Sequence, residues 1–494
     1  MKKIALMICV CLAVFGKDWP IYRIGVQENI AYLEEGRQER LDLYYPADAK
    51  GDERFPGVVI IHGGGWSGGQ KEANREINIA SNLVRMGYVC ISIDYILSKN
   101  GVGTWPRNFM DCKTAVQWMR VNAEKLKLIP DRIGCIGGSA GGHLSTLLAV
   151  GGKDMNLEPT APYGAVDTSI QAGVNLYGIM DLAKWRFEEA DGTPIEGKYR
   201  RPSFLGKKCE EAPELWRFAS PMYQLDKNDP PILQLHGLGD AVVDWWQARD
   251  MKKALDEVGI ENELIFVPGI GHSFALQRPD DKNYPAEIRP AVIRFFDRHL
   301  KGLDEAASKE RYAALQAWEA KHPDNATYWG LNIRSGVLSK NLGNGRWMVK
   351  DNGMETEMQL SESLAVKFEK EVTEADLAEG QVVNGYGNRN EEIDITLDRL
   401  VILDKSYGKM ALGNVSFVNS TLKKTKEGWG VLTIRNGKPG KKVWPLKLSD
   451  RFKVYRRQPG KPDEIKEGMR ILLLEGKCAG DVRLVNMIVL SGEN

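Results

Sequence analysis

The sequence has 494 residues, of which 43% are apolar and 27% are charged, and this balance is typical of a folded globular protein. The length exceeds that of one ordinary α/β domain, so we expect two or three domains. The formal net charge is only +1, which gives no strong field for nucleic acid or an anionic membrane, and neither is expected as a partner.

Residues 1–16 are predicted to form a secretory signal peptide. Two lysines precede an apolar run from Ile4 to about Gly16, which is too short to span a bilayer but suits a signal sequence. We therefore expect export, to the periplasm or outside the cell, with no membrane span. A buried strand or helix at the domain edge is the alternative. Cys9 or Cys11 could carry a lipid anchor, but each follows a large residue that lipoprotein processing disfavours.

Residues 20–303 are predicted to form an α/β domain, because short apolar runs alternate there with longer helix-like stretches. Val, Ile and Leu dominate these runs without strict alternation, as a parallel sheet covered on both faces requires. The strand-like runs are 56–62, 87–95, 131–138, 170–178, 231–237 and 262–269, and the clearest helical stretches are 106–126 and 244–258. The pattern predicts a doubly wound, mostly parallel sheet.

The rest of the chain changes in character. A charged helical stretch over residues 302–322 is predicted to link or buttress the first domain, within a linker of residues 304–335. From about residue 336 onwards, short strand-like runs are broken by Asn-Gly, Pro-Gly and Lys-Gly turns, which predicts an all-β region.

This all-β region contains pairs of similar segments. Trp347–Gly353 is similar to Val431–Gly437, and Arg399–Leu403 is similar to Asn486–Leu490, at offsets of roughly 84 to 88 residues. That period suits a small β-barrel, so we expect two tandem barrels, β repeat 1 over 336–405 and β repeat 2 over 406–494. Chance similarity between strand-turn segments is the alternative.

The strongest chemical signal is the heptapeptide from Gly137 to His143, which reads GGSAGGH. It fits the G-x-S-x-G pattern between a strand-like run and a helix-like stretch, and its glycines allow a sharp turn on both sides of the serine. The helix that starts after the turn supplies amide donors and a favourable dipole. Ser139 is therefore predicted to be a nucleophile, and a small-residue turn without chemistry is the alternative.

A second glycine-rich loop, with the sequence HGGGW over residues 62–66, follows another strand-like run. Backbone amides in such a run can approach a developing oxyanion closely. We predict that the amides of Gly64 and Gly65, together with that of Ala140, form an oxyanion hole. A plain glycine turn is the alternative, and His62 is expected to hold the loop in place rather than to act as a base.

A serine nucleophile needs a base, and the base needs an orienting acid. His272 stands in a glycine-rich loop after the last strand-like run, where the base falls in the chain order serine, acid, histidine. Asp240 follows the run 231–237 and is the predicted acid. Asp244 is its competitor but is expected to cap the helix that follows. The remaining histidines, expected to pack or to face solvent, are His143, His236, His299 and His322.

These roles predict covalent catalysis. Neutral His272 takes the proton of Ser139 as the serine oxygen attacks an acyl carbonyl, and Asp240 holds the imidazole tautomer. An acyl-enzyme forms and is then hydrolysed, which requires no cofactor and no metal. The cysteines form no CxxC pair and no Cys/His cluster that would suggest a metal site.

Together these motifs resemble the HGGGW-type bacterial carboxylesterases and lipases of the α/β-hydrolase superfamily, over roughly residues 38–300. Further features that carry the resemblance are Asp94-Tyr95, the helical stretch 105–118 with Asp111, Ala219-Ser220-Pro221 and the sequence GIGHSF.

This resemblance implies a carboxylic ester hydrolase whose triad is Ser139, Asp240 and His272. It also implies oxyanion donors at Gly64, Gly65 and Ala140, and no cofactor. Relatives often carry proline where this chain has Asp244. Exported members resemble carbohydrate esterases that remove acetyl or feruloyl groups from plant polysaccharides, so the implied substrate is a small-molecule or polysaccharide ester.

Specificity is expected to depend on the insertion between residues 177 and 229, in which aromatic residues are interleaved with arginines. The residues concerned are Trp185, Arg186, Phe187, Tyr199, Arg200, Arg201, Phe204 and Trp216. Such a set suits a sugar or an aromatic acyl ester, and it equally suits a packed insertion.

Two other functions compete with the esterase. A serine peptidase of the prolyl-oligopeptidase kind shares the triad order, but the HGGGW loop favours esters. A glycan- or protein-binding protein with a vestigial hydrolase domain would make the β repeats the working part, and an intact triad speaks against it. In an esterase, the C-terminal β region could still bind glycan or protein.

Overall fold

The computed structural model describes the chain from residue 19 to residue 491, with internal gaps. The residues outside this description are 1–18, 153–154, 189–193, 200–202, 277–285, 322–330, 334–335, 352–353, 390–394, 404–414, 427, 436–437, 480–481 and 492–494. The predicted signal peptide therefore lies outside the described residues. The chain divides into two compact units, unit 1 (Met1–Ala326) and unit 2 (Thr327–Asn494), and each has its own main sheet.

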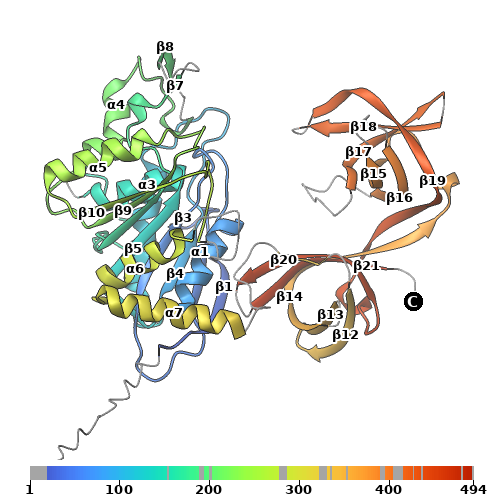
Figure 1. The fold of residues 1–494 in the computed structure, drawn as a ribbon, viewed down its shortest axis with the longest axis horizontal. Coiled ribbons are helices and arrows are strands. Elements are labelled where there is room, and N and C mark those ends of the chain that lie inside the picture. The colour runs from blue at the N-terminus through green and yellow to red at the C-terminus, as the bar shows by residue number, and fades with distance from the viewer. Residues whose placement is uncertain are drawn as a thin grey trace, which may run out of the picture. The chain divides into compact units, whose positions relative to one another are not determined.

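Unit 1 is built around an eight-stranded sheet (Figure 1). In spatial order its strands are β1 (Ile24–Ile30), β2 (Leu41–Pro46), β4 (Val89–Ile93), β3 (Phe55–Ile61), β5 (Leu128–Gly138), β6 (Ala172–Leu176), β9 (Ile232–Gly237) and β10 (Asn262–Val267). The pairings of β1 and β2 are antiparallel, whereas the other six strands run parallel to one another. These six are the predicted strands, so the mostly parallel sheet is confirmed.

Helices lie on both faces of this sheet (Figure 1), which is why strands β3, β4, β6 and β9 are buried along their whole length. They are α1 (Asn74–Arg85), α2 (Arg107–Val121), α3 (Ala140–Val150), α4 (Pro213–Phe218), α5 (Trp246–Val258), α6 (Ile288–Lys301) and α7 (Glu305–Lys321). The predicted helical stretches 106–126 and 244–258 correspond to α2 and α5. The insertion after β6 carries α4 and a small hairpin of β7 (Arg186–Glu188) and β8 (Pro194–Tyr199).

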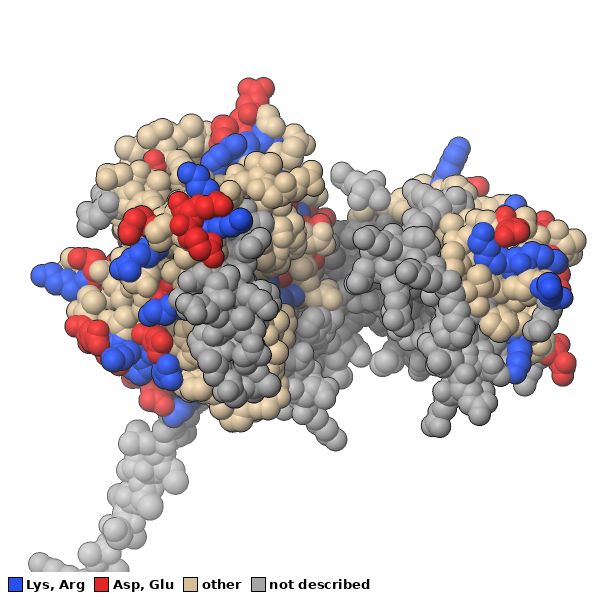
Figure 2. Space-filling view, turned by 90° about the horizontal axis from the view of Figure 1, so that it is seen from above, with Lys and Arg blue, Asp and Glu red and all other residues tan. Residues whose placement is uncertain are grey.

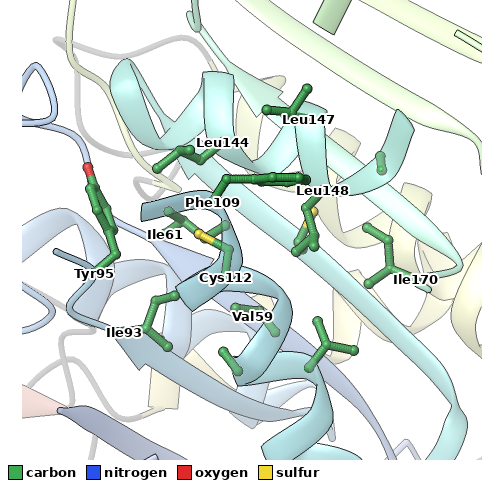
Figure 3. Packing of buried hydrophobic residues seen from close by; sticks show 14 of the residues in the cluster. Val59, Ile61, Ile93, Tyr95, Phe109, Cys112, Leu144, Leu147, Leu148 and Ile170 are labelled. Atoms are coloured by element: carbon green, nitrogen blue, oxygen red, sulfur yellow. The ribbon is translucent and has the colours of Figure 1, made fainter. Parts of the chain in front are cut away.

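Figure 3 shows the core where α2 and α3 pack against the sheet. Phe109 and Cys112 of α2 lie beside Leu144 and Leu148 of α3, over Val59 of β3, and all five side chains are buried. Each large apolar side chain buried in this way contributes roughly 1.5–3 kcal/mol. The core therefore fixes α2 and α3 against the sheet, and α3 begins directly after Ser139.

Helix α7, in the stretch predicted to link or buttress the first domain, belongs to unit 1. It contacts α6, and its Leu315 is fully buried. Arg311 of α7 pairs with Asp297 of α6, and Glu319 of α7 pairs with Arg289 of α6. The helix is thus joined to the core of unit 1 by buried charge pairs as well as by apolar contact.

Unit 2 is an all-β unit with a largely antiparallel sheet among its described residues. Its elements are β11 (Leu331–Ile333), β12 (Gly336–Gly343), β13 (Arg346–Asp351), β14 (Met354–Val372), β15 (Val382–Arg389), β16 (Ile395–Leu403), β17 (Val415–Thr425), β18 (Gly428–Arg435), β19 (Lys438–Gly460), β20 (Arg470–Ala479), β21 (Val482–Ser491) and short 3-10 turns at Glu374–Asp376 and Pro462–Glu464.

The strands of unit 2 pair in two rings of five. Ring A runs β12–β13–β14–β21–β20 and back to β12. Ring B runs β17–β18–β19–β16–β15 and back to β17. Each ring has its own apolar cluster, around Trp347 and Ile488 in ring A and around Leu400 and Val431 in ring B.

The rings do not follow the two predicted repeats. Ring A combines β12, β13 and β14 of the first half with β20 and β21 of the second half. Ring B combines β17, β18 and β19 of the second half with β15 and β16 of the first half. The matching segments still occupy equivalent places, since β13 and β18 are the second strands of their rings. The strand pairing thus crosses the predicted boundary between residues 336–405 and 406–494, and the repeats themselves stay a prediction.

Lys and Arg are interspersed with Asp and Glu on the face shown in Figure 2. Within the described parts of the chain, no helix combines the length and the apolar character needed to cross a membrane. The same residues contain no group of three or more His, Cys, Asp and Glu side chains that could hold a metal ion.

Candidate active site

Ser139 stands on the turn between β5 and α3. Its φ of 58° is positive, which a residue other than glycine rarely adopts, and such a conformation costs roughly 1–3 kcal/mol. The Ser139 N–H donates to the Leu176 carbonyl at 2.9 Å, and the His143 N–H donates to the Ser139 carbonyl at 3.0 Å. These bonds tie the turn to the neighbouring strand and to its own helix.

Close backbone packing explains the glycines of this turn. A Cβ at Gly141 would lie 2.0 Å from the carbonyl oxygen of Ile61, and a Cβ at Gly137 would lie 2.3 Å from the carbonyl oxygen of Gly141. Because both obstacles are backbone atoms, no rotamer change can make room. The end of β3, the end of β5 and the start of α3 therefore meet only if these positions lack side chains.

The loop of residues 62–66 passes beside the nucleophile. A Cβ at Gly63 would lie 3.2 Å from the Cβ of Ser139. Gly64 and Gly65 have φ values of 118° and 60°, and both are exposed. The predicted oxyanion donors, Gly64, Gly65 and Ala140, thus belong to two backbone segments that meet at the serine.

His62 holds this loop. Its Nδ1 lies 2.7 Å from the carbonyl oxygen of Gly63, and its ring stacks on that of Tyr95 with centroids 4.4 Å apart. Burial lowers the pKa of His62, so the ring is neutral and Nδ1–H donates to the carbonyl. This arrangement agrees with a structural role.

His272 lies between Ser139 and Asp240. Its Nε2 is 2.9 Å from Ser139 Oγ, and its Nδ1 is 2.7 Å from Asp240 Oδ2. Because a carboxylate only accepts, Nδ1 carries the proton, and Nε2 is left as an acceptor for the serine hydroxyl. The structure brings together the three residues that the sequence predicts as a triad.

Asp240 is buried and well supplied with donors. Its Oδ1 accepts from the Val242 N–H at 2.8 Å and from the Val243 N–H at 2.9 Å, while His236 Nε2 lies 3.4 Å from Oδ2. Although burial raises the pKa of Asp240, hydrogen bonds from His236, His272 and Val243 outweigh it and hold the pKa below its usual value. The carboxylate is therefore ionised at neutral pH.

Asp244 stands just before helix α5. The helix begins at Trp246 with Trp245 as its N-cap residue, and the Trp245 side chain makes no capping hydrogen bond. The carbonyl of Asp244 accepts from the Gln247 N–H, and a capping bond from the Asp244 side chain stays a prediction. Of the two aspartates, Asp240 is the one that bonds to His272.

His143 packs in the interior. Its Nε2 lies 2.7 Å from the Ala219 carbonyl, and its Nδ1 accepts from the indole N–H of Trp66 at 3.3 Å. Burial lowers the pKa of His143 to about 4, and these contacts occupy both ring nitrogens, so His143 cannot replace His272 as the base. His299 is half-buried on α6 rather than fully solvated, and His322 lies outside the described residues.

The aromatic residues of the insertion divide into two kinds. Phe204 and Trp216 are fully buried, and the Phe204 ring lies 4.5 Å from that of Trp66. Trp185 is half-buried, and its indole N–H donates to the Val242 carbonyl beside the acid. The side chains of Arg186, Phe187, Tyr199, Arg200 and Arg201 lie outside the described residues.

Sequence reasoning missed Tyr177, which follows β6 directly. Its hydroxyl donates to the Phe274 carbonyl at 2.8 Å, and its ring packs edge-on against that of His272 with centroids 4.9 Å apart. A signal was present, because a polar aromatic residue just past a buried parallel strand lies at the sheet edge where sites form.

The fold and the site define the class of protein. A doubly wound sheet with a serine on the turn after a central strand, and with aspartate and histidine on loops after later strands, is the α/β-hydrolase arrangement. Unit 1 therefore has the α/β-hydrolase fold.

Known proteins specify the type further. Residues 41–255 match the BD-FAE family model. Esterase LipC of Mycobacterium tuberculosis (strain ATCC 25618 / H37Rv) is 34% identical over 225 residues, which cover 45% of this chain and 53% of LipC. Esterase LipQ of the same strain is 31% identical over 249 residues, which cover 50% of this chain and 57% of LipQ. Unit 1 is thus similar in sequence to curated esterases, and the chain spans little more than half the length of these relatives.

Among solved structures, a truncated form of a carbohydrate esterase from gut microbiota is 25% identical, covering 52% of this chain and 91% of that chain with a TM-score of 0.44.

Proposed function

We propose that the protein is a serine esterase with Ser139 as nucleophile, His272 as base and Asp240 as orienting acid. The observation that carries the proposal is the continuous hydrogen-bonded series from Ser139 Oγ through His272 to Asp240, with distances of 2.9 and 2.7 Å. The names of the relatives LipC and LipQ, which both describe esterases, support it.

In this mechanism, Ser139 Oγ bonds to the acyl carbon while its proton passes to His272 Nε2. The carbonyl oxygen becomes an oxyanion, which accepts from the amides of Gly64, Gly65 and Ala140. The imidazolium, stabilised by ionised Asp240, then gives its proton to the departing alcohol and leaves an acyl-enzyme. Water attacks the acyl-enzyme by the same route and releases the acid.

We propose an acetyl or feruloyl ester of a polysaccharide as the substrate. Three large apolar side chains remain exposed on the loop that carries Asp240, with exposed fractions of 43% for Leu238, 41% for Val242 and 37% for Trp245. Apolar and aromatic side chains beside a few well-placed polar groups suit the faces of sugar rings and aromatic acyl groups. The predicted signal peptide would deliver the enzyme to such polymers.

We propose the following division of labour along the chain. Residues 20–303 form the catalytic domain, the helix within 304–335 buttresses it, and the signal peptide at 1–16 directs export. Each ring of unit 2 closes as a small β-barrel, and the pair binds glycan or protein. A chain that ends at residue 335 should therefore keep its activity on small esters, and loss of that activity in a folded product would overturn the division.

Ser139→Ala tests the chemistry. Hydrolysis of p-nitrophenyl acetate should fall by roughly 10⁶-fold, because nothing else can form the acyl-enzyme. The thermal unfolding midpoint should stay close to that of the wild type. Ser67→Ala, which removes an exposed hydroxyl just after the glycine-rich loop, is the matched control and should keep full activity. Turnover retained by Ser139→Ala would remove this serine from the mechanism.

A substrate panel tests the specificity. It compares acetylated xylan, methyl ferulate, p-nitrophenyl esters of increasing chain length and Pro-containing peptides. The proposal requires the highest kcat/KM on the first two. Preference for peptides would favour a serine peptidase, and glycan binding without turnover of any member would favour a vestigial hydrolase.

A further inference from the structure

One polar face of α1 contacts the loop that carries His272, and we propose that this face positions the catalytic base. The base loop is defined as residues 268–276. The inference rests on the proposed function, because it assigns positioning residues to that reaction. The face consists of Arg75, Asn78 and Asn82, whose spacing of three and then four residues places them on one side of a helix.

Two of these residues bond directly to the base loop. The Leu276 N–H donates to Asn78 Oδ1 at 2.8 Å, and Asn82 Nδ2 donates to the Leu276 carbonyl at 3.1 Å. Asn78, Asn82 and Leu276 are all fully buried, so water cannot replace either bond. Both backbone polar groups of a residue four positions after His272 thus depend on α1.

Arg75 reaches the same loop through Tyr177. Its Nη1 donates to the Tyr177 hydroxyl at 3.0 Å, and that hydroxyl donates to the Phe274 carbonyl at 2.8 Å. The Tyr177 ring also packs against the ring of His272. The base loop is therefore held at two successive points after the histidine, at residues 274 and 276.

The base needs this support for a geometric reason. Ser273, directly after His272, has a φ of 79°, a value that residues other than glycine rarely adopt. A backbone held against its own preference relaxes unless contacts elsewhere fix it. Because His272 must bond to Ser139 and Asp240 at once, a shift of about 1 Å breaks the arrangement and costs up to about 10²-fold in rate.

The same hydrogen-bonded series continues away from the site to α7. Arg289 Nη1 donates to Asn82 Oδ1 at 3.0 Å, and the Arg289 guanidinium forms two bonds to Glu319, at 2.8 and 3.0 Å. Arg289 is fully buried and Glu319 is nearly so. The helix that follows the predicted catalytic domain is therefore the outer support of the base.

The test compares Asn78→Leu, which keeps the shape but removes the acceptor, with Tyr177→Phe, which removes one oxygen atom. On p-nitrophenyl acetate, kcat should fall about 10- to 100-fold while KM stays within twofold, because a misplaced base affects the chemical step. Ser81→Ala is the matched control. Ser81 is fully buried on the same helix, and among the described residues its hydroxyl bonds to none of the base loop, so kcat should stay within twofold.

A second background separates positioning from general damage. In His272→Ala, no base remains to be misplaced, so adding Asn78→Leu or Tyr177→Phe should change the residual rate less than twofold. A loss of equal size in both backgrounds would show a structural role only and would overturn the inference.

The proposed function is tested with the wild-type protein alone. If wild-type protein neither hydrolyses esters nor reacts at Ser139 with a fluorophosphonate probe, the esterase proposal fails. If the wild type is active and labelled, and folded Asn78→Leu and Tyr177→Phe proteins keep its kcat, only the positioning inference is overturned. Should Asn78→Leu fail to fold, the result for Tyr177→Phe decides.

Discussion

The nucleophile turn, residues 137–142, and the base loop meet the same requirement by different means. Each holds a residue other than glycine at positive φ, Ser139 at 58° and Ser273 at 79°. The nucleophile turn depends on its own glycines, which allow β5 and α3 to close on it and leave room for the Ile61 carbonyl. The base loop is bonded to Asn78 and Asn82, which precede Leu276 by 198 and 194 positions. Local support leaves a motif in the sequence, and distant support does not.

The largest expected loss of activity comes from changing the acid that orients His272 in the base loop. In Asp240→Asn, the new Oδ1 still accepts from the amides of Val242 and Val243, so the acid loop keeps its shape. The amide nitrogen, however, donates where Oδ2 accepted, which forces the proton of His272 onto Nε2. With no acceptor facing Ser139, kcat on p-nitrophenyl acetate should fall roughly 10⁴-fold.

The neighbouring Asp244 provides the control for that experiment. Asp244→Asn changes the same functional group four residues along the chain, and the carboxylate bonded to His272 is that of Asp240. We expect kcat within about threefold of the wild type. A larger loss in Asp244→Asn than in Asp240→Asn would reverse the assignment of the acid.

The next effect concerns His143, which stands one turn after Ser139 on the nucleophile side. Burial lowers its pKa to about 4 in the folded protein, whereas an unfolded chain titrates near 6.5. The unfolded state therefore binds more protons between these values. The contribution of neutral His143 to the free energy of unfolding is therefore complete above about pH 6.5. It falls by about 3 kcal/mol as the pH approaches 4.

His143→Gln removes this proton uptake. The free energy of unfolding, measured with urea at pH 7 and at pH 4.5, should fall less in the variant than in the wild type. His62, whose pKa is also lowered by burial, leaves part of the slope in place. An unchanged difference between the two pH values would show that His143 is not the group that titrates.

The comparison also explains what could be predicted from the sequence. The strands of the parallel sheet, and the meeting of Ser139, Asp240 and His272, follow from apolar runs and from motifs at strand ends, which are local features. The sequence does not predict that α1 bonds to the base loop. Asn78 and Asn82 match no motif, and their partner Leu276 is almost 200 residues away in the sequence.

Unit 2 shows the same limit at the level of whole strands. Paired segments in the sequence predict two repeats, and β13 and β18, which carry one such pair, are the second strands of their rings. No local sequence feature, however, predicts that β16 pairs with β19 of the other half, or that β21 pairs with β14. Partner choice between two similar copies is decided by the connections and the cores, and a single sequence does not display it.

The smallest expected changes in stability and kcat are those of substitutions at Ser273 in the base loop. In Ser273→Gly, relief of the positive φ is offset by the larger entropy of the unfolded glycine, so stability should change by no more than about 1 kcal/mol. If α1 sets the geometry of the base loop, kcat should remain within twofold, because residue 273 itself fixes nothing. Ser273→Val should instead lower the thermal midpoint, since a β-branched residue tolerates this φ worst. A tenfold loss of kcat in Ser273→Gly would mean that the base loop, like the nucleophile turn, is held by its own residues, and would contradict the role assigned to Asn78 and Asn82.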